Sequence, residues 1–245
     1  MTEPPQDRAA TTAPAADHPR AARLNRWRDR PLTGWRERLW AWADMIFLDH
    51  GFIRWVYLNL HRVGERAWRA AQPSPGQIAR IARRHGIRTV VNLRGGQSYG
   101  SLPLEIEACE RAGVAFENFV LRSRAVPTPE EVHAAKALFA RIDYPVLFHC
   151  KSGADRAGMM SALYLILAEN RPVAEARRQL SWRFGHISSG KTGVLDAMFD
   201  AYEAEAGGRP FLDWIADGYD RDAIMTGFRP TGIGTFLADT LLRRE

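Results

Sequence analysis

The sequence has only two cysteines among its 245 residues, and charged residues interrupt every long apolar stretch. Two cysteines are too few for a disulfide framework, and without paired C-x-x-C spacings they do not indicate a zinc cluster. A secretory signal is also missing, because the first twenty residues are rich in Pro and Ala and lack an apolar core. We therefore expect thiols that stay reduced, as they do in the cytosol.

Acidic residues are fewer than basic ones. The chain has 34 Lys and Arg against 28 Asp and Glu, a net charge of +6 and a pI near 9.7. Such a balance favours anionic partners, namely phosphate groups, acidic lipid surfaces or nucleic acid. The 46% of hydrophobic residues suits one globular domain with extensions.

Changes in composition divide the chain into four expected parts. Residues 1–23 are expected to form a disordered tail, and residues 24–66 a Trp/Arg-rich helical extension. Residues 67–207 form the main domain. Residues 208–245 are expected to be a C-terminal helical appendage, in which no chemistry is evident.

The extension carries tryptophans and arginines side by side, and Asp44, Asp49, His50 and Arg54 divide its apolar run, so it is too interrupted to span a bilayer. Two interpretations are open. The extension could pack its aromatic face on the main domain. Alternatively, it could lie in a membrane interface, with tryptophans at headgroup level and arginines near anionic lipid. Its five tryptophans are Trp27, Trp35, Trp40, Trp42 and Trp55.

After a turn-rich boundary at residues 69–76, helical and strand patterns alternate. Short apolar runs predict buried strands at residues 87–93, 114–121 and 145–149. Strands separated by helices predict an α/β fold, with a mostly parallel central sheet flanked by helices. Helices are predicted at residues 77–85, 103–112, 128–142, 156–169, 172–182 and 192–206.

One cysteine, Cys150, lies in the stretch FHCKSGADRAG between a predicted strand and a predicted helix. Backbone N–H groups of such a loop, together with those of the first helical turn, form an anion site. Gly153 permits the sharp turn, and Arg156 offers a planar pair of donors to phosphate oxygens. This positive environment should hold Cys150 as a thiolate, which is an in-line nucleophile for phosphoryl transfer through a cysteinyl-phosphate.

The stretch HCKSGADRAG resembles the H-C-x5-R-[ST]-G motif of the cysteine-dependent protein tyrosine and dual-specificity phosphatases, in particular atypical bacterial members. The resemblance covers roughly residues 70–200. It implies the Cys-phosphatase fold and no cofactor or metal, with Cys150 as nucleophile, Arg156 as phosphate clamp and His149 as a brace that tunes the thiolate. The phosphate cradle would be formed by Lys151, Ser152, Gly153, Ala154, Asp155 and Arg156.

The chain departs from that family at two places. Ala157 stands where the family has Ser or Thr, whose hydroxyl helps the leaving thiolate when the intermediate is hydrolysed. The separate general-acid aspartate is also missing, because there is no aspartate between His50 and Ile142. Asp143 would start about 20 Å from the thiolate at about 3.3 Å per residue and is rejected. Glu117, inside a predicted strand, is a weak candidate.

Asp155 remains as the candidate general acid. Bacterial phosphatases and myotubularin-type lipid phosphatases with an Asp-Arg pair at this place are thought to use the loop aspartate as the acid. The alternative is that Asp155 only caps the following helix.

A second motif, GHISSGKT at residues 185–192, matches the nucleotide-binding P-loop pattern G-x-x-x-x-G-K-[ST]. That pattern binds a triphosphate only between a buried strand and a helix, and the preceding sequence is helical and charged. Nucleotide binding is therefore a minor alternative. We expect instead that Gly185 ends one helix and that Ser189 or Thr192 caps the next.

The substrate is expected to be a phosphotyrosine protein or a membrane lipid phosphate. Arg94, Arg122, Arg124 and Lys151 could face the same end of the sheet, more positive charge than one phosphotyrosine needs. A catalytically weak module that binds phosphate or anionic lipid is the alternative function, and no nucleic acid is expected. The expected location is the cytoplasm, with peripheral contact on the inner face of an anionic membrane as a further possibility.

Overall fold

The computed structural model describes residues 32–49, 51–95 and 99–231. In this part of the chain a five-stranded sheet has the order β1-β2-β5-β3-β4, and only β1 and β2 are antiparallel to each other. The expected α/β class with a mostly parallel sheet is confirmed. The strands are β1 (His61–Arg62), β2 (Ala67–Ala71), β3 (Thr89–Asn92), β4 (Ala115–Asn118) and β5 (Val146–Cys150).

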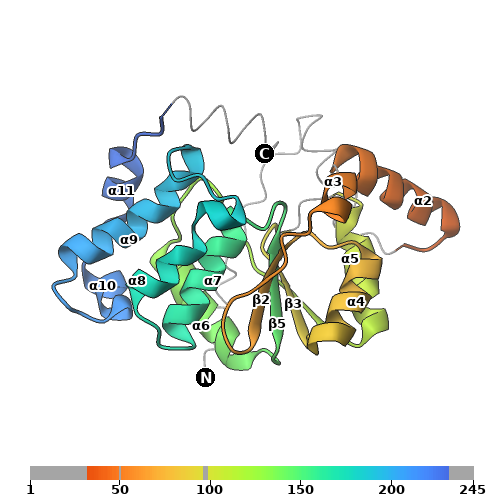
Figure 1. Cartoon of the computed structure of the whole chain (residues 1–245), viewed down its shortest axis with the longest axis horizontal. Coiled ribbons are helices and arrows are strands. Elements are labelled where there is room, and N and C mark those ends of the chain that lie inside the picture. Colours follow the sequence, from red (N-terminus) through yellow and green to blue (C-terminus); the bar gives the residue numbers. More distant parts are fainter. Residues whose placement is uncertain (1–31, 50, 96–98, 232–245) are drawn as a thin grey trace, which may run out of the picture.

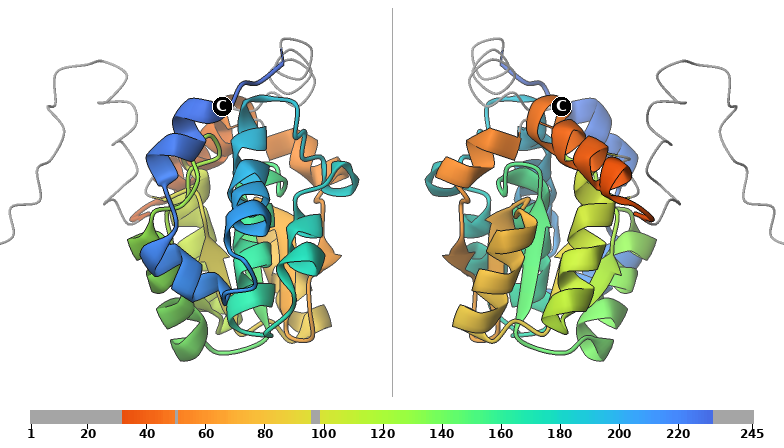
Figure 2. Two further views of the ribbon diagram at one scale, coloured as in Figure 1. Left: turned by 90° about the vertical axis from the view of Figure 1, so that its left-hand side faces the viewer. Right: turned by 90° about the vertical axis from the view of Figure 1, so that its right-hand side faces the viewer.

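Helices cover both faces of the sheet (Figures 1 and 2). Side chains alternate along β5, so that Phe148 enters the larger core with α6 and α7, whereas Leu147 enters a smaller core with α4 and α5. The first layer contains α4 (Pro75–His85) and α5 (Ser101–Ala112). The second contains α6 (Pro129–Arg141), α7 (Asp155–Leu167), α8 (Val173–Ala176), α9 (Val194–Glu205), α10 (Phe211–Asp217) and α11 (Arg221–Gly227).

The helix ends agree with the sequence where a capping residue next to the helix marks the end. Gly86 and Gly113 end α4 and α5 in the left-handed conformation, and Thr128 caps α6 by accepting a hydrogen bond from Glu131 N. The predicted helix at 172–182 is wrong in its second half, because α8 gives way to the 3-10 turns η2 (Arg177–Gln179) and η3 (Trp182–Phe184). The predicted cap of the next helix is also wrong. Thr192 donates to Ile187 O instead, and the turn η4 (Lys191–Gly193) leads into α9.

The strands β1 and β2 are absent from the sequence prediction, which places a turn-rich boundary at residues 69–76. The sequence of β2, AWRAA, has little apolar bulk and an arginine at its centre. Arg69 is nevertheless completely buried, because its guanidinium group finds carbonyl partners far away in sequence. A buried arginine with remote partners is invisible to a rule based on local periodicity.

The N-terminal helices α2 (Trp35–Ala43) and α3 (Gly51–Val56), joined by the π-helical turn η1 (Asp44–Leu48), lie beside α5 (Figure 1). Ala41 and Met45 pack against Leu104, and Arg38 forms an ion pair with Glu107 at 2.5 Å. Gly100 lies so close to α2 that a Cβ at this position would be 2.2 Å from Ala41 O.

The outer side of α2 is apolar. Trp35 and Trp40 are 70% and 63% exposed, whereas Trp42 packs against the cluster of Ala41, Met45 and Leu104, so the two interpretations of this segment both stay open. Among the described residues, no helix is both long and apolar enough to cross a membrane.

The division into four parts stays a prediction. The tail 1–23 lies outside the described residues. β1 falls within the part predicted as a helical extension, and Phe211 and Trp214, from the predicted appendage, are buried in the same core as Phe199.

Candidate active site

The loop after β5 joins the strand to α7 in the predicted order. Cys150 is the last residue of β5 and Asp155 is the first residue of α7. Gly153 between them has φ +74°, and a Cβ there would lie 2.6 Å from the backbone of Ala70. Both the backbone angle and the space therefore require glycine at this position.

The carbonyl oxygens of this loop are all bound from outside it. Lys151 O accepts from Gln72 N at 3.3 Å, and Ser152 O accepts from the Asn59 side chain at 3.0 Å. Arg69 Nη2 donates to the two remaining carbonyls, those of Gly153 at 2.7 Å and Ala154 at 2.8 Å. Carbonyls that are bound from outside the loop are compatible with an anion cradle, in which the N–H groups face the opposite side.

Cys150 and Arg156 lie at the two ends of this loop. The Cys150 side chain is buried, and Arg156 is buried in the first turn of α7. The structure thus unites Cys150, Asp155, Arg156 and residues 151–154 in one strand–loop–helix unit. Their chemical roles stay predictions.

Arg69 braces the loop from behind and was missed by the sequence analysis. Besides its bonds to the loop, its Nη1 donates to the backbone and side chain of Gln179 at 2.6 and 3.0 Å, and its guanidinium group lies over the Phe184 ring. Burial lowers the pKa of Arg69 to about 10, although Cys150 and Asp155 act to raise it. Arg69 therefore remains a cation at neutral pH, next to the group expected to be a thiolate.

His149, which the resemblance predicts to brace the loop, is buried beside Glu105. His149 Nε2 lies 2.5 Å from Glu105 Oε1, and both side chains are buried. Gln72 connects this pair to Arg94, because it donates to Glu105 at 2.6 Å and accepts from Arg94 at 2.9 Å.

Arg94, expected to bind substrate, is held instead in a buried ion pair. Its two Nη atoms each lie 2.8 Å from an oxygen of Asp49, a residue of the N-terminal segment. Arg54 and Ser101 bind the same carboxylate, and Lys151 lies 4.0 Å from it. Burial opposes ionisation, but the charge of Arg94, helped by Arg54 and Lys151, lowers the pKa of Asp49 to about 2. Asp49 is therefore a permanent anion and a poor proton donor.

Asp155 has a partner that the sequence analysis did not identify. Its Oδ1 lies 2.7 Å from Nδ1 of His186, and the other ring nitrogen of His186 lies 2.7 Å from Asp196 Oδ2. His186 is buried, and Asp155 is the first residue of α7, directly after the N-cap Ala154. Both roles of Asp155, as general acid and as helix cap, stay predictions.

Asp155, His186 and Asp196 together carry one more proton than a neutral imidazole and two ionised carboxylates would carry. A neutral imidazole has a single N–H, whereas two contacts of 2.7 Å between nitrogen and oxygen require a hydrogen in each. The second proton lies either on the ring or on a carboxylate. Burial opposes the charge on His186, but its bonds to Asp155 and Asp196 raise its pKa.

The other acid candidates lie elsewhere. Glu117 binds Arg141 through both oxygens at 2.6 and 2.8 Å. The backbone carbonyl of Asp143 accepts a hydrogen bond from Thr89 at the start of β3, which is the end of the sheet opposite the Cys150 loop. Neither is placed to protonate the leaving oxygen of a phosphate ester that Cys150 attacks.

The P-loop pattern at residues 185–192 lacks the strand that nucleotide binding requires. It follows the 3-10 turn η3 and precedes η4, and its second residue is His186. The minor alternative of a nucleotide site is therefore wrong. His186, which contacts Asp155, lies within that motif, and the sequence analysis did not identify it as a site residue.

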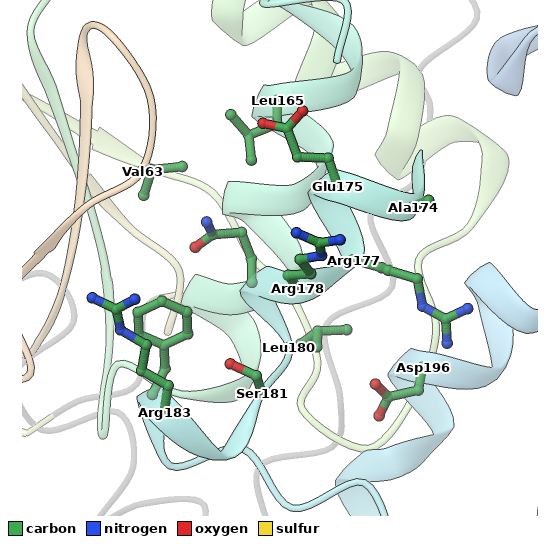
Figure 3. Close-up of a pocket in the computed structure, with 12 residues that line it drawn as sticks. Val63, Leu165, Ala174, Glu175, Arg177, Arg178, Leu180, Ser181, Arg183 and Asp196 are labelled. Atoms are coloured by element: carbon green, nitrogen blue, oxygen red, sulfur yellow. The ribbon is translucent and has the colours of Figure 1, made fainter. Parts of the chain in front are cut away.

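A surface depression of about 760 Å³ lies behind the loop rather than at Cys150 (Figure 3). Its wall includes Gln179 and Phe184, both partners of Arg69, and Asp196, the partner of His186. Figure 3 shows Arg183 at one side and Arg177 at the other. Among the described residues, no group of three or more His, Cys, Asp or Glu side chains is placed to hold a metal.

Comparison with known families shows the family to which the chain belongs. Residues 61–192 match the model of PTP-NADK, described as a DSP-PTPase phosphatase fused to NAD+ kinase. The chain belongs to this family of DSP-type phosphatases. The match covers the sheet, the Cys150 loop and the segment with His186. No curated protein matches the chain.

Solved phosphatase structures are also similar, at low identity. TpbA of P. aeruginosa is 19% identical, with a TM-score of 0.42 over 69% of this chain and 90% of that chain. A cysteine-to-serine variant of TpbA in complex with phosphotyrosine is 19% identical, with a TM-score of 0.45 over 66% and 92% of the two chains. PTPMT1 is 21% identical, with a TM-score of 0.44 over 60% and 98%.

Proposed function

We propose that this phosphatase hydrolyses phosphomonoesters through a cysteinyl-phosphate on Cys150. The supporting observation is the loop whose four carbonyls, from Lys151 to Ala154, are bound from outside, an orientation that suits an anion site on the other side of the loop. The Cys150 thiolate attacks phosphorus as the ester oxygen leaves, and Arg156 binds two of the equatorial phosphate oxygens. Water then attacks the cysteinyl-phosphate, which releases phosphate and restores the thiolate.

In this proposal Asp155 is the general acid that protonates the leaving oxygen. It is the carboxyl group next to Arg156 at the start of α7, and its Oδ1 contacts His186. His186 is a positioning residue, which fixes the orientation of Asp155 and shares the additional proton with it. Asp196, whose side chain is 17% exposed, connects the pair towards solvent and allows Asp155 to be reprotonated after each turnover.

The proposal is tested by phosphate release from an aryl phosphate, a phosphotyrosine peptide and phospholipid vesicles, with the wild type and Cys150→Ser side by side. We expect all turnover to disappear in the variant. A Cys150→Ser variant with full activity would refute the cysteine mechanism. Absence of turnover by the wild type, with phosphate still bound, would favour the weak binding module.

Between the two substrate classes, we favour a phosphate ester carried by a membrane lipid over one on a protein. The support comes from the N-terminal segment, which supplies Asp49 to the network around Lys151 and also carries the exposed side of α2. A peripheral position on an anionic membrane is part of this proposal.

A further inference from the structure

Large apolar side chains are exposed mainly on one segment of the chain. Ten such side chains are exposed among the described residues, and eight of them lie between positions 35 and 57. Single exposed apolar residues are normal, but a gathered group marks an interaction surface. We name this group the aromatic face: Trp35, Leu39, Trp40, Phe47, Leu48, Phe52, Val56 and Tyr57.

The aromatic face is directed away from the protein core. Ala41 and Met45 form the buried side of the segment, against Leu104 of α5. At 100° per residue, Trp35 and Leu39 lie on the opposite side of α2, with Arg36 between them and Trp40. In a helix of a globular protein the apolar residues normally face the core, and here the outer side is apolar as well.

The charges of the segment are arranged to leave this side without free carboxylates. Glu37 binds Thr33, Asp44 accepts from Gly100 N, and Asp49 is enclosed by Arg94 and Arg54. Arg36, by contrast, is exposed on the same side as Trp35. Exposed tryptophans beside arginine complement the apolar boundary and negative headgroups of an anionic bilayer.

The aromatic face is fixed rigidly to the Cys150 loop. Asp49 follows Leu48 directly and lies 4.0 Å from Lys151 Nζ. Two residues after Tyr57, Asn59 donates to Ser152 O at 3.0 Å. Figure 1 shows α2 and α3 at the end of the sheet where β5 enters its loop.

We infer that the aromatic face docks on an anionic lipid bilayer and presents the Cys150 loop to phosphate esters in lipid headgroups. This inference rests on the proposed function, because it names the substrate class of the same site. A bilayer fits better than a protein partner because exposed Trp35 and Trp40 lie beside the exposed Arg36, a combination suited to the headgroup region of an anionic membrane.

The test uses the full chain and vesicles of phosphatidylcholine, alone or mixed with phosphatidylglycerol. We expect the wild type to float with the mixed vesicles only. The double variant Trp35→Glu/Trp40→Glu should lose binding at least tenfold, whereas Trp182→Glu, which changes a 77% exposed tryptophan outside the face, should bind as the wild type does. All three proteins should hydrolyse a soluble aryl phosphate equally, which also shows that the variants fold.

Three outcomes would overturn the inference: no flotation of the wild type with mixed vesicles, equal flotation of the double variant, or a wild-type dimer that the double variant dissociates without lipid. The last would make the aromatic face a contact between two copies. Failure of the proposed function has a different result, namely vesicle binding without Cys150-dependent hydrolysis of the soluble ester.

Discussion

His186 Nδ1 lies 2.7 Å from Asp155 Oδ1, 31 residues earlier in the chain and inside the loop that carries Cys150. The contact connects α7 to the segment before α9, where Asp196 binds the other ring nitrogen. In the proposed mechanism, Asp155, held by this buried imidazole, takes the place of the separate aspartate that the resemblance leads one to expect.

Asp155→Asn should reduce kcat/KM by about 10²–10⁴-fold on a substrate with a poor leaving group such as phenyl phosphate. The loss should be much smaller on a nitrophenyl ester, whose leaving oxygen needs no proton. His186→Gln should show the same selective loss at a lower magnitude, together with a shifted pH–rate profile. Equal losses on both esters would show that Asp155 and His186 have structural roles only.

The same triad predicts a pH-dependent stability. The pKa of His186 is raised above its ordinary value of 6.5 by Asp155 and Asp196, and Arg69 is the nearby cation that acts on Asp155. A raised pKa in the folded state contributes stability that is fully present below about pH 6.5 and is lost as the pH rises through the raised pKa. Urea unfolding should therefore show a larger difference between the wild type and His186→Gln in mild acid than in alkali. A constant difference would refute this coupling.

Asp49 is predicted to hold the N-terminal segment against the site. Asp49→Asn leaves Arg94 and Arg54 without their buried anion and should lower the free energy of unfolding by about 3–5 kcal/mol at neutral pH. Because the pKa of Asp49 is lowered from 3.8 to about 2, the difference from the wild type should persist above pH 3.8 and disappear as the pH falls towards 2. Chemical denaturation over this pH range measures it, with Asp213→Asn as a surface control. A neutral-pH loss below about 1 kcal/mol, the range of an exposed pair, would contradict the predicted role.

The sequence predicted what depends on neighbouring residues and missed what depends on distant ones. The strand, loop and helix around Cys150 lie within 22 residues, from Val146 to Leu167, so motif and periodicity located them together. Arg69, Asp49 and His186 reach the site across 84, 45 and 31 residues, through contacts that no local pattern encodes. Of these three residues, only His186 lies in a motif that the sequence analysis noted, and that motif suggested nucleotide binding. Asp49, the ion-pair partner of Arg94, belongs to a segment that the sequence analysis interpreted as an extension.

Ala157 is predicted to slow the second chemical step. It is fully buried in the first turn of α7, where its carbonyl accepts from Ser161, and it lacks the hydroxyl that the resemblance associates with thiolate departure. Rapid mixing with a nitrophenyl ester should therefore give a burst of nitrophenol equal to the enzyme concentration, followed by slow turnover. Ala157→Ser should raise the slow rate and leave the burst rate unchanged. A wild type without a burst would contradict this order of steps.

The cysteinyl-phosphate is the centre of the account, and trapping it is the most direct measurement. Wild-type protein should be mixed with an aryl phosphate, quenched in acid within the burst, digested and examined by mass spectrometry. We predict one phosphate on the peptide that contains Cys150, absent from Cys150→Ser and accumulating further in Asp155→Asn when the ester has a good leaving group. Turnover of the wild type with no phosphate on Cys150, or with phosphate on another residue, would contradict the mechanism.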